Sequence, residues 1–597
     1  MQTRKGQIRA PLGISGPGES AMRTIFPAEI SVRCFIMRYI GLALLLLAVP
    51  GLAQDAPHKH AGSSASGDTA ATANRFGTVQ FTTTCAPSQV DDFNGAVALL
   101  HSFEYEEARA AFIDVLRKDP KCAMARWGES MTYFHGLWSE YNAASGAQAA
   151  AAARRLAADN PQTSDREKMY IAAISEIFTE EAIKASQSDD NQPDHSGYSQ
   201  PARAAELKYT ERMAELHKQY PADKEATIFY ALALDISAKR SDKTHADIKQ
   251  CTALLKPLFV EMPNHPGVAH YIIHCDDNPE MASEGLEAAR KYAQIAPAST
   301  HATHMPSHIF AQLGLWNEMV DSNRASLKAA EQSANAASCE KIGNAIHAMD
   351  FLVVALIETG RMQEARDVLD HANKITSPAG GGDRCGASAK NEVFAAYALE
   401  TGEWEKATEI KVDEADNSPI AGPMWMAVGI GAARTGDAAR AHQAERQLTA
   451  MRDARSRLPG QTLDNSLEPL RLAVAGWQAQ RAGDKKLARE MLRKGADLQD
   501  QLGSNYTVIK PVREMLADLL LLNGDQAGAL AEYKAVLVLQ PNRFNSVYGA
   551  GSAAFATGDA GTAKAYYKQL LAFANGDERP QLATARARIT EMVAERK

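Results

Sequence analysis

Six histidines gather in two short segments, HPGVAHYIIHCDD and THATHMPSHIF, between His265 and His308. Imidazole is the commonest neutral side-chain ligand for zinc, copper, iron and nickel, and its pKa near neutrality also suits proton transfer. Three histidines, or histidines with a carboxylate, can hold a metal ion and leave a position open for water or substrate. The candidate metal ligands are His270, His274, His301, His304, His308, His347 and Asp350.

The spacing of these histidines indicates that their rings converge. His270 and His274 are four residues apart, which places both on one face of a helix. His301, His304 and His308 fall within about one 60° sector if their segment is a continuous helix.

Pro306 opens an alternative. A proline biases the residue before it away from helical dihedrals, so the helix can instead begin at Pro306 and leave His301 and His304 on the preceding turn. Histidines in helical proteins also cap helix ends or bond carbonyls in a core, so a structural role stands beside the metal role for each ring.

A repeated pattern gives the elements that must position these side chains. Short turns with a glycine separate pairs of apolar-periodic segments, and a small residue follows five positions later. The glycines are Gly314, Gly360, Gly402, Gly436, Gly483, Gly524 and Gly558; Phe103 takes the glycine's place in the first unit. The small residues are Ala108, Ala365, Ala407, Ala441, Ala488, Ala529 and Ala563, with Met319 in the Gly314 unit. An aromatic follows nine positions after three of these turns, at Phe112, Tyr533 and Tyr567.

These residues resemble the tetratricopeptide repeat family over about residues 88–135 and 225–595. The resemblance implies an all-α, right-handed α-solenoid of helical hairpins, whose stability is a sum over neighbouring interfaces. It also implies a concave groove that binds a peptide or protein partner. His301 and His304, and His347 and Asp350 at the same two offsets in the next unit, stand at first-helix positions that face this groove in the family. The segments HPGVAHYIIH and HMPSHI are similar to those of a group of exported bacterial tetratricopeptide proteins.

The amino-terminal region predicts export. The segment from Met37 has one positive charge, an apolar run from Ile40 to Val49, and small residues up to Ala53, which is the pattern of a cleaved signal peptide. The run is too short to span a bilayer of about 30 Å. We therefore expect a periplasmic or secreted protein that begins near Gln54 and has no integral membrane segment after cleavage.

The cysteines fit an oxidising compartment. Six follow the expected cleavage site, and no CxxC motif occurs. Sequential pairing is the simplest hypothesis, and six buried free thiols are the alternative. The expected pairs are Cys85 with Cys122, Cys251 with Cys275, and Cys339 with Cys385.

These patterns divide the chain into seven ranges: 1–36, an upstream extension that does not fold; 37–53, the signal peptide; 54–77, a flexible leader; 78–138, amino-terminal hairpins; 139–224, an irregular helical region with a polar loop; 225–380, central histidine-rich repeats; and 381–597, carboxyl-terminal repeats.

Composition excludes some classes of function. Hydrophobic residues make up 45% and charged residues 23%, which excludes bulk disorder and a polytopic membrane protein. The net charge of −8 argues against a nucleic-acid partner. The leading hypothesis is an exported repeat protein that binds a peptide, protein or small ligand in a histidine-lined groove, with a divalent transition metal as the candidate cofactor. The alternatives are a metal-dependent enzyme that uses the same histidines and a cell-envelope assembly scaffold.

Overall fold

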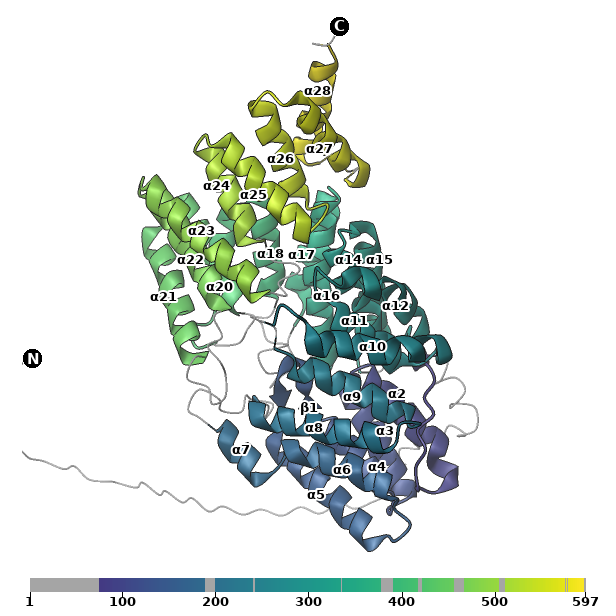
Figure 1. Ribbon diagram of the computed structural model, residues 1–597. Helices are drawn as coiled ribbons and strands as arrows, with labels where there is room; N and C mark the ends of the chain where they lie inside the picture. Colours follow the sequence, from purple (N-terminus) through teal and green to yellow (C-terminus); the bar gives the residue numbers. More distant parts are fainter. Residues whose placement is uncertain are drawn as a thin grey trace, which may run out of the picture. The chain divides into compact units, whose positions relative to one another are not determined.

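The computed structural model describes residues 75–187, 199–239, 242–333, 335–376, 390–416, 421–455, 466–503, 510–574, 576 and 578–594. Over these ranges the chain is almost entirely helical (Figure 1), which confirms the predicted all-α class. Within the same ranges, the strands are β1 (Phe134–His135) and β2 (Glu140–Tyr141), which pair antiparallel as a two-residue ladder.

The helices follow one another as antiparallel hairpins along the chain. The first group is η1 (Pro87–Gln89), α2 (Val90–His101), α3 (Tyr105–Lys118), α4 (Ala123–Met131), η2 (Gly136–Trp138), α5 (Ala143–Asp159), α6 (Asp165–Ile177), α7 (Glu180–Ser186), α8 (Arg203–Gln219) and α9 (Lys224–Ser237). The central group is α10 (Ala246–Glu261), α11 (Pro266–Asp276), α12 (Ala282–Ile295), α13 (Thr300–His304), α14 (Pro306–Gln312), α15 (Trp316–Gln332), α16 (Cys339–Glu358) and α17 (Met362–Lys374). The last group is α18 (Asn391–Thr401), α19 (Trp404–Glu409), α20 (Ala421–Thr435), α21 (Ala438–Arg455), α22 (Leu467–Arg481), α23 (Lys485–Leu502), α24 (Val512–Leu522), α25 (Gln526–Leu539), α26 (Phe544–Ala556), α27 (Ala560–Phe573) and α28 (Pro580–Ala594).

The turn inside each hairpin explains the repeated glycine. All seven glycines of the pattern have positive φ, between 65° and 102°, a region that side chains with a Cβ rarely adopt. In several units an aspartate follows the glycine and caps the second helix: Asp484 accepts a hydrogen bond from the Leu487 N–H, and Asp559 accepts one from the Thr562 N–H. Glycine thus ends one helix and aspartate starts the next.

The small residues of the pattern are all fully buried, as expected for positions where two helices approach closely. The aromatic residues fill the space between hairpins. A Cβ added at Gly128 on α4 would lie 2.3 Å from the ring of Phe112, and one at Gly549 on α26 would lie 2.3 Å from the ring of Tyr533. The glycine of one helix therefore makes room for the aromatic side chain of the helix before it.

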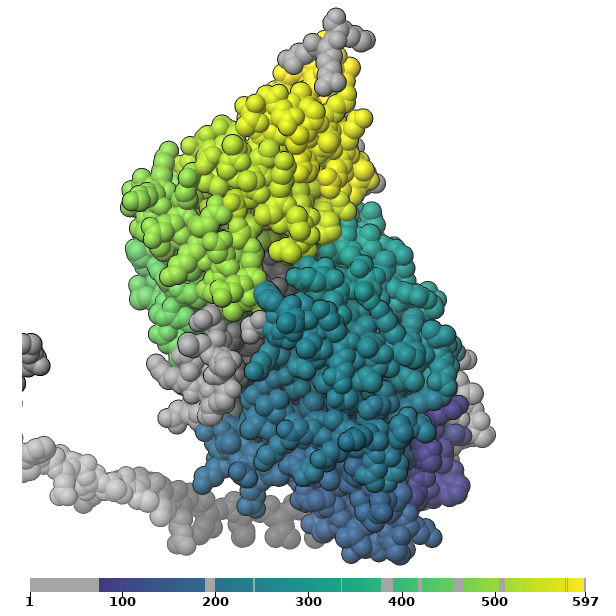
Figure 2. Space-filling view, viewed as in Figure 1, coloured from purple at the N-terminus to yellow at the C-terminus, as the bar shows by residue number. Residues whose placement is uncertain are grey.

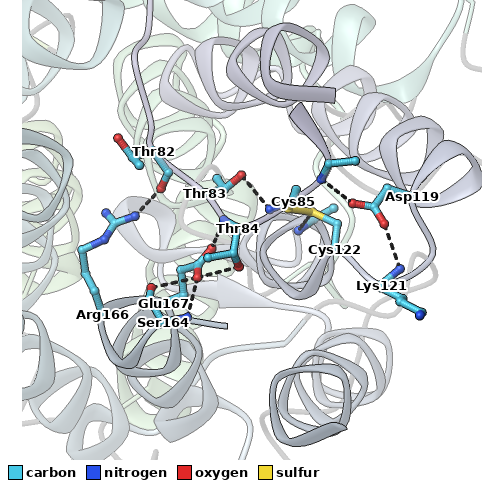
Figure 3. The surroundings of a disulfide bond; sticks show 12 residues. Thr82, Thr83, Thr84, Cys85, Asp119, Lys121, Cys122, Ser164, Arg166 and Glu167 are labelled. Atoms are coloured by element: carbon cyan, nitrogen blue, oxygen red, sulfur yellow. Dashed lines mark hydrogen bonds between the residues drawn. A yellow bond between two sulfur atoms is a disulfide. The ribbon is translucent and has the colours of Figure 1, made fainter. Parts of the chain in front are cut away.

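A disulfide between Cys85 and Cys122 joins the first ordered segment to the loop between α3 and α4 (Figure 3). Around it, the Thr84 N–H and hydroxyl both donate to the Glu167 carboxylate, at 2.7 and 2.8 Å. The Arg166 guanidinium donates to the Thr82 carbonyl. These contacts attach the extended residues before η1 to α6, which follows α2, α3, α4 and α5 along the chain.

A second disulfide, between Cys251 and Cys275, joins α10 to α11. Cys339 is also disulfide-bonded, while its expected partner Cys385 lies outside the described residues. Both pairs that fall within the described ranges follow the sequential order. The second one is attached directly beside His274 and so stabilises the helix that carries two candidate ligands.

Contacts between units distant in sequence are the main departure from the expectation of neighbouring interfaces alone. The Trp316 indole N–H donates to the Asn542 carbonyl at 2.7 Å, and the Asn542 amide donates to the Gly314 carbonyl. In the space-filling view the carboxyl-terminal residues adjoin the central ones (Figure 2). The central residues also contact the amino-terminal hairpins: Lys341 on α16 pairs with Glu104 and Glu107 near the start of α3. Packing between distant repeats therefore adds to packing between neighbours.

One continuous hydrophobic cluster extends from Val79 to Tyr397, and two further clusters cover the carboxyl-terminal helices. Within the described ranges, no helix combines the length and apolar character that crossing a bilayer requires. The histidine-rich segments lie inside the first cluster.

Candidate metal centre

Helices α11, α13, α14 and α16 lie side by side and carry the six candidate histidines (Figure 1). Helix α11 begins with His265 as its N-cap and Pro266 in its first turn, where a missing N–H costs nothing. Its residues from Pro266 to Ile273 are buried. The predicted i, i+4 pair on this helix therefore points into the protein interior.

Three of these imidazoles form one group, which we call triad A: His270, His274 and His301. The His270 Nε2 lies 3.0 Å from the His274 Nε2 and 3.0 Å from the His301 Nε2. One potential ligand atom from each ring lies within 4.8 Å of the others. His270 and His301 are buried, and His274 is half-buried.

The backbone of α2 sets the orientation of triad A. The His270 Nδ1 lies 2.6 Å from the His101 carbonyl, which can only accept, so Nδ1 carries the hydrogen and Nε2 offers a lone pair. A single lone pair thus faces two imidazoles at 3.0 Å. Fixing Nδ1 with an oxygen acceptor is how metal-ligating histidines are held in proteins.

The other three imidazoles form triad B: His304, His308 and His347. The His304 Nε2 lies 3.1 Å from the His308 Nε2, and the ring centroids of His304 and His347 are 4.6 Å apart. The ligand atoms of this triad also lie within 4.8 Å of one another. His304 is buried, His308 half-buried and His347 exposed, so triad B extends from the interior to the surface.

Oxygen acceptors also orient triad B. The Asn323 amide nitrogen donates to the Met319 carbonyl, so its Oδ1 faces His304 and accepts from the His304 Nδ1 at 2.7 Å. The Asp277 Oδ2 lies 2.9 Å from the His308 Nδ1, while the Gln312 amide donates to Asp277 Oδ1 at 3.0 Å. Three of the six rings therefore have Nδ1 fixed and Nε2 directed toward a triad.

Burial keeps the interior imidazoles neutral. It lowers the pKa of His270 to about 3, and burial together with the neighbouring imidazoles lowers the pKa of His301 and His304 well below the usual value. Neutral imidazole is the form that binds metal, because protonation removes the lone pair. His270, His301 and His304 are therefore in the metal-binding form at physiological pH.

Pro306 divides this segment into two short helices, although Met305 before it keeps helical dihedrals, with φ of −53° and ψ of −34°, and His301 and His304 are helical rather than on a turn. Helix α13 ends at His304 and α14 begins at Pro306, with Met305 between them. His301 joins triad A, whereas His304 and His308 join triad B, so these three rings do not form one site. The ring centroids of His301 and His304 are 6.5 Å apart, which makes the two triads neighbours.

Asp350 is not part of either triad. It is buried on α16, and burial raises its pKa to about 8. Glu392 at the start of α18 is electrostatically coupled to it. The carboxylate that contacts a candidate ligand is instead Asp277, which follows α11.

Aromatic rings cover both triads. The Phe103 ring centroid lies 4.4 Å from that of His270 and 5.4 Å from that of His301. The Phe351 ring lies 4.8 Å from His304 and 4.6 Å from His308. Phe103 has φ of 57°, in the region where the other turns use glycine. Its ring therefore occupies this place at the expense of backbone strain.

A buried group behind triad A was missed by sequence reasoning. Glu225 on α9 accepts from the His101 Nε2 at 3.0 Å and from the His265 Nε2 at 2.9 Å. Burial would raise the pKa of Glu225, but the two imidazoles outweigh it and hold this pKa below its usual range. The group fixes His101, whose carbonyl orients His270. Its three members are spread over 165 residues, and no local motif marks them.

No protein-family model matches the chain, and no curated protein matches it. Among solved structures, the APC/C hetero-tetramer Cut9–Hcn1 aligns over 84% of this chain and 89% of that chain, with 11% identity and a TM-score of 0.31. The human IFIT1 dimer with m7Gppp-AAAA aligns over 82% and 91%, with 11% identity and a TM-score of 0.35. A tetratricopeptide repeat protein from Parabacteroides merdae aligns over 49% and 98%, with 14% identity and a TM-score of 0.25.

The chain has a tetratricopeptide-type fold. The assignment depends on the described helices, their positive-φ glycine turns and their buried small residues. Arrays of this kind present extended surfaces for protein partners. In this chain, the same architecture also brings histidines from three successive hairpins into two adjacent triads.

Proposed function

We propose that the protein is an exported helical-repeat protein that binds transition-metal ions at triads A and B. The observation that carries this proposal is the convergence of six imidazoles in two groups, with three Nδ1 atoms fixed by oxygen acceptors. Buried polar groups in folded proteins usually face a partner of opposite character. Within the triads the Nε2 atoms lie 3.0–3.1 Å apart, and a metal ion could replace these imidazole–imidazole hydrogen bonds by binding the same lone pairs.

The ligand atoms of the two triads narrow the choice of metal ion. Nitrogen ligands suit zinc, copper, iron and nickel, whereas magnesium, calcium and manganese prefer oxygen. Neither triad, as formed by the described residues, contains a carboxylate. A three-histidine site with no carboxylate fits copper or zinc best among these metals.

The exposure of His347 favours a catalytic metal site over a purely structural one. Structural zinc sites are closed by four protein ligands, whereas a catalytic site keeps a position open. Each triad offers three ligands, and triad B reaches the surface. A metal-dependent enzyme is therefore the second candidate function, with a peptide, protein or small ligand bound on the surrounding groove.

Elemental analysis tests the metal proposal. Protein produced without a polyhistidine tag and saturated with copper or zinc should hold two equivalents per chain after desalting. His274→Ala and His347→Ala should each lose one equivalent. The matched control is His371→Ala, an exposed histidine on α17, which should keep both. Wild-type protein that retains no metal, or variants that retain as much as wild type, would contradict the proposal.

Export has a separate test. The two disulfides and the bonded Cys339 support an oxidising compartment. Intact mass of protein recovered from the periplasm or medium should correspond to a chain that begins near Gln54. A full-length chain that stays in the cytosol would show that this part is wrong.

A further inference from the structure

We propose that triads A and B hold a pair of copper ions that act together and reduce dioxygen by two electrons. This inference rests on the proposed metal binding and names the metal and the co-substrate. It starts from the symmetry of the two triads. Each contains two histidines four residues apart, and each adds one histidine from a neighbouring helix.

The two triads are built as a pair. His301 and His304 lie on the same five-residue helix, α13, and contribute to different triads with their ring centroids 6.5 Å apart. One short element therefore supplies a ligand to each site and keeps the sites adjacent.

Charge and burial favour copper over zinc. Imidazole binds a metal ion as the neutral ring, so six such ligands supply no charge, and Asp277 contacts a ligand rather than a triad centre. Two zinc ions would bring four positive charges into a site lined by buried rings, whereas two Cu(I) ions would bring two. Isolated charge is costly in an apolar surrounding, so the lower oxidation state is stabilised. Copper also binds nitrogen sites more tightly than other divalent metals of its row.

The walls of the site suit a small uncharged molecule. Phe103 covers triad A, and Phe351 covers triad B, each with its ring within 5 Å of a ligand ring. Dioxygen chemistry is typical of protein-bound copper. Two Cu(I) ions each give one electron to one dioxygen molecule, and two protons from solvent complete the product. The outcome is two Cu(II) ions and one hydrogen peroxide, and an external reductant such as ascorbate returns the copper to Cu(I).

The strain at Phe103 is consistent with this role. Seven other hairpin turns of the pattern use glycine at this position, but the first turn has Phe103 at φ of 57°. Strained backbone persists where the surrounding structure fixes it, and it gathers at functional sites. The ring contacts His270, His274 and His301, so the strained residue excludes water from triad A.

The test uses the full chain loaded with copper, reduced with ascorbate and desalted without oxygen. On addition of oxygenated buffer, wild-type protein should consume one dioxygen for every two copper ions. Its Cu(II) electron paramagnetic resonance signal should account for much less than the copper present, because adjacent ions couple magnetically. His274→Ala and His347→Ala should each bind one copper, give the full signal of an isolated ion and react at least about tenfold more slowly. His371→Ala should match wild type.

Other outcomes separate the two proposals. If wild type binds two copper ions but its signal accounts for all of them, and each single-triad variant consumes half as much dioxygen, the sites act independently and the pair is overturned. If the protein retains two zinc ions that copper does not displace, the copper inference fails while metal binding stands. If neither metal is retained, the proposed function itself fails.

Discussion

Two buried polar clusters in this protein have opposite character. Arg543, at the start of α26, lies among carboxylates from three other helices and is fully buried with them. Its Nη2 lies 2.5 Å from Glu400 Oε1, and its Nε lies 3.1 Å from Glu514 Oε2. In the triads, imidazole nitrogens face one another instead. Both clusters join segments that are distant along the chain.

The difference shows how to distinguish a polar cluster that stabilises the fold from one that can bind a metal ion. Around Arg543, opposite charges compensate one another. Burial would raise the pKa of Glu514, but Arg543 and Lys510 lower it to about 2, so the carboxylate stays charged. Around His270, burial lowers the pKa, and no acid group lies between the rings of the triad. A cluster that compensates itself stabilises the fold, whereas one that lacks a central charge is suited to receive a cation.

The largest effect is expected at the compensated cluster. Arg543→Met removes the cation that pairs with Glu400 and leaves Glu514 with Lys510 alone, and breaking a buried pair in this way costs about 3–5 kcal/mol. Urea denaturation should show this loss in the free energy of unfolding. The copper or zinc content should not change, because the cluster does not contact a triad. Arg588→Met, which removes an exposed pair with Glu591, should leave the denaturation midpoint unchanged. A loss of metal without a loss of stability would reverse the roles assigned to the two clusters.

A loss of similar size is expected at Phe103, where the strain can be isolated by comparing two substitutions. Phe103→Gly and Phe103→Ala both remove the buried ring, at a cost of about 3–5 kcal/mol for an alanine. Glycine tolerates φ of 57° whereas alanine does not, so Phe103→Gly should be more stable than Phe103→Ala by about 1 kcal/mol.

Phe112, in the middle of α3, is the matched control for this pair. It is also a buried phenylalanine, but it has helical backbone, where glycine is worse than alanine by about 1 kcal/mol. The order of the two variants should therefore reverse between Phe103 and Phe112. If alanine is the more stable replacement at both positions, the backbone at Phe103 is not strained.

The repeat pattern was sufficient to predict the hairpins. A positive-φ turn and a close helix contact each leave a local requirement in the sequence, glycine in one case and alanine in the other, and these recur at fixed offsets. The same pattern showed Phe103 in a glycine position. The order of the cysteines gave the two disulfides that lie within the described residues, because helical hairpins pack next to their neighbours.

The division into two triads could not be predicted in the same way. A helical wheel placed His301, His304 and His308 together, but His301 joins triad A and the other two join triad B, although His301 and His304 share α13. The contact from His270 to the His101 carbonyl spans 169 residues, so it depends on tertiary packing rather than local spacing. For the same reason Asp277 could not be distinguished from Asp350 as the orienting carboxylate. The sequence pattern was therefore enough to identify the candidate ligands. Which histidines share a triad, and which residue orients each ring, depends on tertiary packing.

The smallest effect is expected at Asp277, and it sharpens the contrast between a ligand and the residue that orients it. Asp277→Asn keeps the shape of the side chain but removes the charge that fixes the His308 Nδ1. Loss of such an orienting partner typically weakens metal affinity by about 10–100-fold, which is about 1.4–2.7 kcal/mol. Competition with a chelator should show this loss for one of the two equivalents only, since the candidate ligand that Asp277 orients, His308, belongs to triad B.

Asp370→Asn on α17 makes the same chemical change at an exposed position and should leave both affinities unchanged. The free energy of unfolding of metal-free Asp277→Asn should stay close to that of wild type, because Gln312 can still donate to the remaining amide oxygen. An equal loss at both equivalents would mean that the two triads share one orienting network. No loss at either equivalent would mean that Asp277 does not orient His308. The position of the His308 ring would then be set by its contacts with His304 and His347 alone.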